Sequence, residues 1–180
     1  KLDFKKGVPK EYTTMVVIPT LLTSVSGAKN LAHKLEIYYL ANQDPNIYFA
    51  LLTDFADADE ETVPGEEELL QTAVEEINKL NEKYGDAKNT RFFLFHRRRL
   101  WNPREEKWMG WERKRGKLTE FNALLCGEKD HTFSHIIGNT EILPGIRYVI
   151  TLDHDTQLPR DSAKELIGAL SHPLNRPQLD

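Results

Sequence analysis

Two aspartates separated by one residue, Asp153 and Asp155, follow directly on the mainly apolar run 146–152. A run of this composition predicts a buried strand, so both carboxylates should lie in the turn where the strand ends. Carboxylate oxygens are ligands that Mg²⁺ or Mn²⁺ prefers, and a diphosphate could supply the other ligands. A metal held there would neutralise charge on a leaving group. The alternative is that this Asp-rich turn only caps the next helix.

Two further segments carry candidate ligand-binding groups. Asp54 ends the apolar run 47–52, and its carboxylate could accept the imide N–H of uracil or a ribose hydroxyl. The basic segment 113–117, which ends in Lys117, precedes a helix that we predict over 118–126. Basic side chains and free N–H groups at a helix start suit a diphosphate. Both segments also have plain structural interpretations, as a solvated acidic loop and as a basic surface that serves solubility.

Trp101, Trp108 and Trp111 alternate with basic residues, a pattern that also occurs in proteins that bind nucleic acid. The chain as a whole is acidic, with a net charge of -4 and a pI of about 5.9. Its basic residues are concentrated in 96–117 and its acidic residues in 54–76. One basic loop in an acidic chain argues against a nucleic-acid partner. We expect these tryptophans to anchor an irregular loop in the core.

The sequence lacks the pattern of a zinc or disulfide site. Its single cysteine, Cys126, excludes an internal disulfide and a cysteine-based zinc site. Four histidines show no metal-ligand spacing with one another: His96, His131, His135 and His172. We expect them to be ordinary surface or partly buried side chains.

Four predicted strands, each followed by a helix, would position the candidate residues. The strands are expected at 15–18, 47–52, 91–96 and 146–152, and the helices from Ser26 to the stop at Asn42, from 64–66 to Gly85, over 118–126 and over 161–170. This alternation predicts an α/β fold with a mainly parallel, doubly wound sheet. Ligands of such sheets bind at the carboxyl ends of the strands, where Asp54 and the Asp153 turn should lie.

The bulk properties predict one domain. The chain has 180 residues, of which 39% are hydrophobic, enough for a proper core. It starts at Lys1 without Met and ends in a Pro-rich stretch, so we expect a single truncated domain, 1–180, with poorly ordered edges at 1–14 and 172–180. No apolar run approaches the roughly 20 residues that span a bilayer, and we expect this piece to be soluble.

In chain order, four motifs resemble those of the inverting GT-A glycosyltransferases of the cellulose-synthase-like type. They are Met-Val-Val-Ile-Pro-Thr at 15–20, Asp54, Gly-Lys-Leu-Thr-Glu-Phe-Asn at 116–122, and Leu-Asp-His-Asp at 152–155. The longer strings 95–103, 153–159 and 169–177 look like the glycosyltransferase region of the cyclic β-1,2-glucan synthases. The resemblance covers nearly the whole chain.

The resemblance implies the nucleotide-sugar-binding half of a GT-A domain, with UDP-glucose as the donor substrate and Mg²⁺ or Mn²⁺ as the metal. Asp54 would contact uracil, Asp153 the ribose or the metal, Asp155 the metal, and Lys117 the diphosphate. The catalytic base would lie outside this chain, in the half of the domain that receives the glucan acceptor. The resemblance further implies a large bacterial parent membrane protein, with this region at the cytoplasmic face of the inner membrane.

Two other classes of protein share part of the pattern. Haloacid-dehalogenase-like phosphohydrolases also place D-x-D after an apolar strand and bind Mg²⁺ there, but their D-x-D-x-[TV] pattern would require Thr or Val where Gln157 stands. A non-catalytic nucleotide-sugar-binding or structural module is the second alternative. Titration of UDP with and without Mn²⁺ would separate the three.

Overall fold

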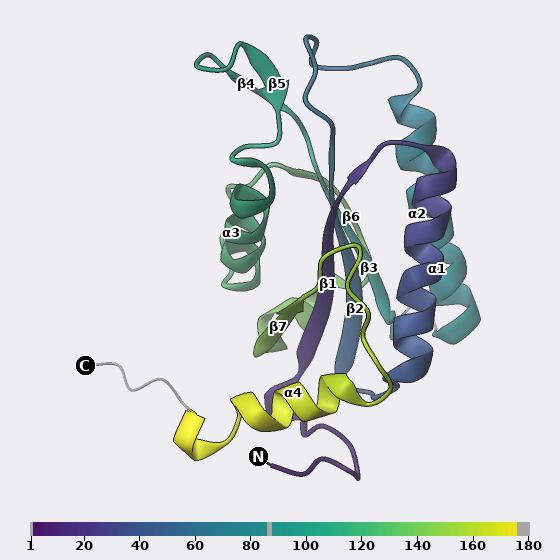
Figure 1. Cartoon of the computed structure of the whole chain (residues 1–180), viewed down its shortest axis with the longest axis vertical. Helices are drawn as coiled ribbons and strands as arrows, with labels where there is room; N and C mark the ends of the chain where they lie inside the picture. Colours follow the sequence, from purple (N-terminus) through teal and green to yellow (C-terminus); the bar gives the residue numbers. More distant parts are fainter. Residues whose placement is uncertain (1, 86–87, 176–180) are drawn as a thin grey trace.

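The computed structural model describes residues 2–85 and 88–175, and its centre is a five-stranded sheet (Figure 1). The strand order is β6-β3-β2-β1-β7; the pairs of β3, β2, β1 and β7 are parallel, and β6 is antiparallel to β3. The strands are β1 (Thr14–Leu22), β2 (Ile47–Phe55), β3 (Phe92–Arg97), β6 (Phe133–Ile137) and β7 (Tyr148–Thr151). The prediction of an α/β fold with a mainly parallel sheet is confirmed.

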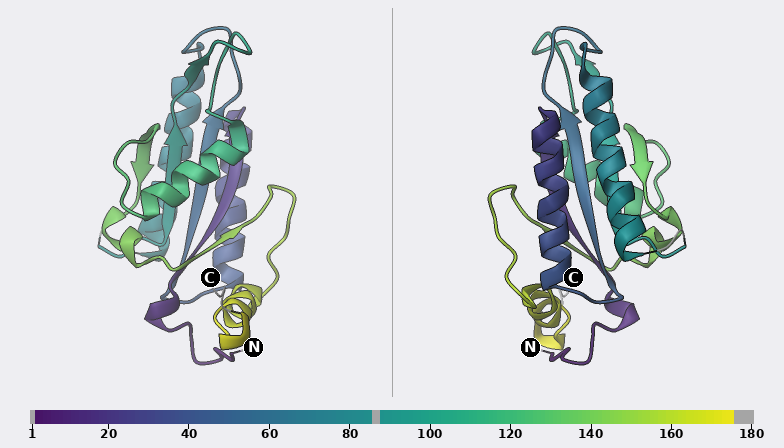
Figure 2. Two further views of the ribbon diagram at one scale, coloured as in Figure 1. Left: turned by 90° about the vertical axis from the view of Figure 1, so that its left-hand side faces the viewer. Right: turned by 90° about the vertical axis from the view of Figure 1, so that its right-hand side faces the viewer.

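Helices cover both faces of the sheet, as the two views of Figure 2 show. Helices α1 (Val25–Ala41) and α2 (Glu66–Tyr84) lie on one face, and α3 (Arg113–Leu125) lies on the other. Helix α4 (Ser162–Leu170) lies across the end at which β1 begins (Figure 1). Three short 3₁₀ helices complete the helical elements of the described residues: η1 (Lys10–Tyr12), η2 (Thr140–Gly145) and η3 (Pro173–Asn175).

Alternate residues of each strand enter separate cores, because successive strand side chains point to opposite faces. Val16 and Leu51 pack in the core under α1 and α2, whereas Val17 and Leu52 pack in the core that includes Phe121 of α3. Burial on both faces explains why these strands are continuous apolar runs. The arrangement is compatible with a Rossmann-like fold.

Strand β1 is longer than predicted, because it continues past Pro19 to Leu22. Proline has no N–H and usually ends pairing in a sheet. Leu152 N donates to Val17 O at 2.9 Å, so odd-numbered residues of β1 direct their backbone groups toward β7. Strand β7 pairs no further than Val17. The missing N–H of Pro19 therefore points beyond the end of β7, where no strand partner is lost.

Several local predictions were wrong. Helix α1 is capped by Ser24, whose hydroxyl accepts from Gly27 N at 3.0 Å, and not by Ser26. Helix α3 begins at Arg113, within the segment predicted as a loop. Strand β6, which was not predicted, is short and lies at the sheet edge with a mixed polar and apolar composition. The pattern of a half-exposed edge strand is weaker than that of a buried strand.

The predicted loop before α3 contains a small hairpin, formed by β4 (Leu100–Asn102) and β5 (Lys107–Met109). Trp101 packs against Trp108 across it, with ring centroids 5.8 Å apart. Trp101 and Trp111 are each 47% exposed, so the prediction that they anchor this segment in the core was wrong.

The ends of the described chain are held by hydrogen bonds. Leu2 N donates to Gly168 O at 3.0 Å, and Asn175 Nδ2 donates to Ala169 O at 2.7 Å. The remaining parts of the predicted edges, residue 1 and residues 176–180, lie outside the described residues. Within 2–85 and 88–175, none of the helices has both the length and the apolar composition that a membrane span requires.

Candidate functional site

Asp54 and the turn 153–155 lie at the same edge of the sheet, because β2, β1 and β7 are parallel. Asp54 is in register with Leu21, near the end of β1. Strand β7 ends beside Val17, so the turn 153–155 begins before the level of Asp54 along the sheet. A cavity of about 620 Å³ opens at this edge. Its lining is Pro19, Thr20, Leu21, Thr23, Asp54, Phe55, Asp57, Gly110, Arg113, Lys114, Lys117 and His154. We call it the donor cleft.

Asp54 is only 2% exposed, and its carboxylate is bound by Arg97. The guanidinium donates from Nε to Oδ1 at 2.8 Å and from Nη2 to Oδ2 at 3.0 Å. Its other N–H groups donate to Glu120 Oε2 at 2.5 Å, Trp111 O at 3.1 Å and Arg113 O at 2.9 Å. All five guanidinium donors are therefore used, and they tie the ends of β2 and β3 to the start of α3.

Two glycines allow the backbone to lie directly on this network. A Cβ at Gly110 would be 2.8 Å from Asp54 Oδ2, and a Cβ at Gly116 would be 1.9 Å from Trp111 O. Gly116 lies inside α3. Its position in a helix is thus explained by close approach of the backbone and not by a turn.

Gly116→Ala is expected to lower the free energy of unfolding by about 1–3 kcal/mol, the usual cost of forcing extra volume into a packed site. In an open helix the same change would stabilise by about 1 kcal/mol, so the sign reports the clash with Trp111 O. Urea denaturation measures it. Gly145→Ala is the matched control, because a Cβ there meets nothing within 4 Å. Equal stability of the two variants would contradict the prediction.

Lys117 lies in the second turn of α3. It is only 2% exposed, and it lines the cleft. Its Nζ donates to Thr20 O at 2.8 Å and lies 3.2 Å from Asp54 Oδ2. Burial lowers the pKa of this ammonium, and the negative charge of Asp54 opposes that shift. An ammonium has three donors. Two are directed to these partners, which leaves one for a ligand in the cleft.

The turn after β7 presents its carboxylates to solvent. Asp153 forms an ion pair with Lys114 of α3, and this hydrogen bond lowers the pKa of Asp153. Asp155 is exposed and has no side-chain partner among the described residues. Tyr38 of α1 donates its hydroxyl to the carbonyl of Thr156, which holds the turn against the helix. Both carboxylates are therefore accessible to a ligand beside the cleft.

The donor set of Asp153 and Asp155 fits a metal that is shared with a diphosphate. Across 2–85 and 88–175, no group of three or more His, Cys, Asp and Glu side chains is arranged to hold a metal ion. A cage made by the protein alone is therefore absent from that part of the chain. Mg²⁺ commonly uses one or two carboxylates and takes its other ligands from phosphates and water.

A search with family models gave no match for the chain. Cyclic beta-(1,2)-glucan synthase NdvB of Rhizobium meliloti (strain 1021) is 47% identical to it over 175 residues. The alignment covers 97% of this chain. The chain is homologous to a segment of a cyclic β-(1,2)-glucan synthase. The resemblance to the cyclic β-1,2-glucan synthases is confirmed, and the chain spans 6% of the length of this curated relative.

Three residues of the site were not predicted from the sequence: Arg97, Gly110 and Glu120. Arg97 has a fully buried side chain, although Arg97 to Arg99 look like a solvated basic run. Glu120 accepts from Thr132 N and Arg97 at once. The signal that could have found Arg97 is its place at the end of an apolar strand, directly after His96, which is in register with the residue before Asp54.

His96, beside Arg97 on β3, faces the opposite side of the sheet. It is 1% exposed, and its Nδ1 lies 2.8 Å from the hydroxyl of Thr53. Its ring meets Phe55 edge-on at 4.4 Å between centroids. Burial lowers the pKa of His96 to about 4, with the charge of Asp54 acting in the opposite direction. The imidazole is therefore neutral at pH 7.

This burial predicts a loss of stability in acid. An unfolded His96 takes up a proton as the pH falls through about 6.5, whereas the folded protein does so only near pH 4. The contribution of His96 to the free energy of unfolding is fully present above the unfolded pKa. It declines by about 3 kcal/mol as the pH falls to 4. Urea denaturation at pH 7 and pH 4.5 should show a smaller loss in His96→Gln than in the wild type. The exposed His33→Gln serves as control, and identical losses in all three proteins would refute the prediction.

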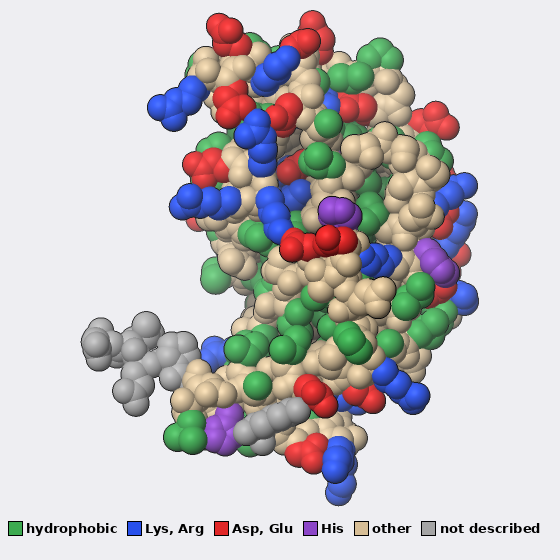
Figure 3. All heavy atoms as spheres, in the orientation of Figure 1, with side chains coloured by type: hydrophobic (Ala, Val, Ile, Leu, Met, Phe, Trp, Pro, Cys, Tyr) green, Lys and Arg blue, Asp and Glu red, His purple; other side chains and the backbone are tan. Residues whose placement is uncertain are grey.

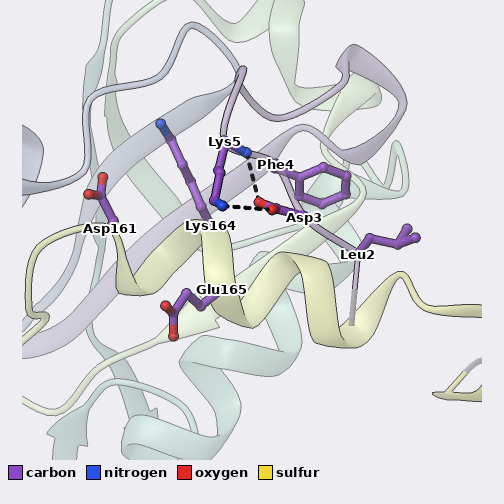
Figure 4. A pocket seen from close by; sticks show the side chains of 7 residues that line it. All are labelled: Leu2, Asp3, Phe4, Lys5, Asp161, Lys164 and Glu165. Carbon is purple, nitrogen blue, oxygen red and sulfur yellow. Dashed lines mark hydrogen bonds and ion pairs between the residues drawn. The ribbon is translucent and has the colours of Figure 1, made fainter.

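Outside the donor cleft, the surface has other charged regions and another cavity. Figure 3 shows acidic and basic side chains interleaved over the upper part of one face and hydrophobic side chains gathered below them. A cavity of about 530 Å³ lies at the opposite end of the sheet (Figure 4). It is lined by Leu2, Asp3, Phe4, Lys5, Asp161, Lys164 and Glu165. Lys5 pairs there with Asp3 at 3.5 Å, and none of the predicted site residues takes part.

Proposed function

We propose that this chain is the donor-binding part of an inverting GT-A glycosyltransferase, which binds UDP-glucose together with Mg²⁺ or Mn²⁺ for the synthesis of a β-1,2-glucan. The observation that carries the proposal is the donor cleft, where Asp54 and Lys117 lie beside the Asp153 turn at the carboxyl edge of the sheet. Homology to a segment of a glucan synthase supports the class of reaction.

The cleft offers matched groups to the two ends of a nucleoside diphosphate. Lys117 has one donor free for the diphosphate, and its charge lies next to the start of α3. A carboxylate has about four acceptor positions, and Asp54 uses three of them on Arg97 and Lys117. The fourth can accept the imide N–H of uracil. The network thus fixes the orientation of the Asp54 carboxylate and leaves one acceptor position for the base.

Asp153 and Asp155 are proposed to hold the metal, which when bound offsets negative charge on the departing diphosphate. Lys114 pairs with Asp153 and lines the same cleft. With Asp153 as a metal ligand, the ammonium of Lys114 would be available to a phosphate oxygen in the cleft. The carboxylate then exchanges one cation for another, so its charge stays compensated throughout.

The acceptor side of the reaction is proposed to lie outside this chain. The remainder of the parent protein would supply the catalytic base and the site for the glucan acceptor. We place the parent in the bacterial inner membrane, with this segment at the cytoplasmic face. The fragment by itself is expected to bind the donor and to transfer no glucose.

Calorimetric titration of UDP into the chain, with Mn²⁺ and again with EDTA, tests the proposal. Metal-dependent binding of UDP, with weaker binding of inorganic phosphate, is the expected result. A preference for inorganic phosphate would support a phosphohydrolase. Absence of binding in both conditions would support a structural module.

A further inference from the structure

A row of polar side chains crosses the sheet on the face opposite the donor cleft. Thr53 of β2 is in register with His96 of β3, and His96 is in register with His135 of β6. The three side chains therefore lie side by side, with the two imidazole centroids 6.2 Å apart. Ser134 Oγ lies 2.9 Å from His135 Nδ1. In this face of the sheet, the polar row begins where the apolar core ends.

This row opens into a cavity of about 730 Å³, which we call the histidine cavity. Its lining is Phe55, Glu61, Thr62, Val63, Pro64, Gly65, Glu66, Glu67, Leu70, His96, Arg98, Arg99, Ser134 and His135. His96 is almost fully buried, and its Nδ1 is held by Thr53. No other residue in 2–85 or 88–175 hydrogen-bonds to its Nε2. Nε2 is thus an imidazole nitrogen without a protein partner among the described residues, at the wall of a cavity, where it can hydrogen-bond to a ligand.

The charges of the histidine cavity are mixed. Arg99 and Glu66 neutralise each other in a two-point ion pair, at 2.6 and 2.5 Å. Arg98 and Glu67 are exposed, and neither side chain has a partner among the described residues. A bound anion would meet the carboxylate of Glu67, and a bound cation would meet the guanidinium of Arg98. The cavity therefore favours a neutral ligand that both donates and accepts hydrogen bonds.

Phe55 adds an apolar surface to these polar groups. It lies at the end of β2, lines both this cavity and the donor cleft, and separates them. An aromatic ring beside donors and acceptors of both kinds matches a sugar, which has apolar C–H faces and a rim of hydroxyls. The neutral state of His96 at pH 7 agrees with a hydroxyl partner.

We propose that the histidine cavity is a carbohydrate-binding site, separate from the donor cleft, which holds a glucosyl unit of a neutral glucan. In this site, His96 Nε2 and the side chains of Arg98 and Glu67 hydrogen-bond to sugar hydroxyls. Phe55 packs against a C–H face. The cavity and its side chains carry the site itself, whereas the choice of a glucan, and of a β-1,2-linked probe, rests on the proposed function.

Titration of the chain with sophorose, the β-1,2-linked disaccharide of glucose, tests this assignment by NMR of the histidine side chains. The expected result is saturable shifts of the His96 and His135 ring signals. Arg98→Ala and Glu67→Ala should each weaken sophorose binding about fivefold, the effect of one lost hydrogen bond. Both positions are exposed, so neither change should unfold the chain. UDP binding should be the same in both variants as in the wild type.

Three results would overturn the site. They are no shifts up to the solubility limit of sophorose, sophorose affinity that is unchanged in both variants, and stronger binding of inorganic phosphate than of sophorose at these histidines. Asp155→Ala separates this site from the donor cleft. If the variant and the wild type both fail to bind UDP but bind sophorose, the transferase proposal falls and the carbohydrate site stands.

Discussion

Replacing Arg97 by Met is expected to lower the free energy of unfolding by about 3–5 kcal/mol, the cost of removing one partner from a buried ion pair. The change removes two hydrogen bonds to Asp54 and one to Glu120, whose side chains are 3% and 14% exposed. Lys117 remains near Asp54 but reaches only one of its oxygens, at 3.2 Å. Buried negative charge is therefore left without adequate compensation.

The same change should also disturb the donor cleft. Arg97 holds the carbonyls of Trp111 and Arg113, which precede and begin α3. Its loss frees the segment that carries Lys114 and Lys117, so UDP binding should weaken even under conditions in which the variant stays folded. Lys at this position should not restore stability, because a single ammonium cannot reproduce the five-donor geometry.

Urea denaturation at pH 7 provides the measurement for Arg97→Met. The matched control is Arg98→Met, one residue along the chain, whose side chain is exposed and should change stability by no more than about 0.5 kcal/mol. A loss below about 1 kcal/mol in Arg97→Met would show that the network does not hold the strand ends to α3.

Asp155→Ala is expected to weaken Mn²⁺-dependent UDP binding at least about 100-fold, roughly 2.7 kcal/mol. The carboxylate is one of two protein ligands available to the proposed metal. Because Asp155 is exposed and has no side-chain partner in the described part of the chain, its removal should leave the stability within about 0.5 kcal/mol of the wild type. Loss of binding would therefore report the metal and not the fold.

Calorimetry with UDP and Mn²⁺ measures this effect. Asp130→Ala is the control, since Asp130 is also an exposed loop aspartate without a side-chain partner among the described residues. EDTA should bring the wild type to the level of Asp155→Ala and should not change the variant further. Undiminished UDP binding in Asp155→Ala would remove Asp155 from the metal site.

The sequence by itself predicted the parallel sheet and the edge at which the candidate residues lie. Strands β2 and β3 are apolar runs buried on both faces, and α2 shows one apolar face with acidic residues in its first turn. These are local patterns, set by burial and by the period of each element. The position of Asp54 at the end of β2 follows from the same pattern, as does the turn that contains Asp153.

Only the tertiary structure decided which charges meet. Arg97 lies 43 residues from Asp54 along the chain and 23 from Glu120, and its place at the end of an apolar strand does not show which carboxylates it meets. Lys117 stood out as a basic residue, but its burial against Thr20 depends on where α3 packs. Partners so distant in sequence are joined by strand register and helix placement, which arise from the packing of the whole core. Composition and spacing reveal an ionisable group, whereas its burial and its partner are properties of the fold.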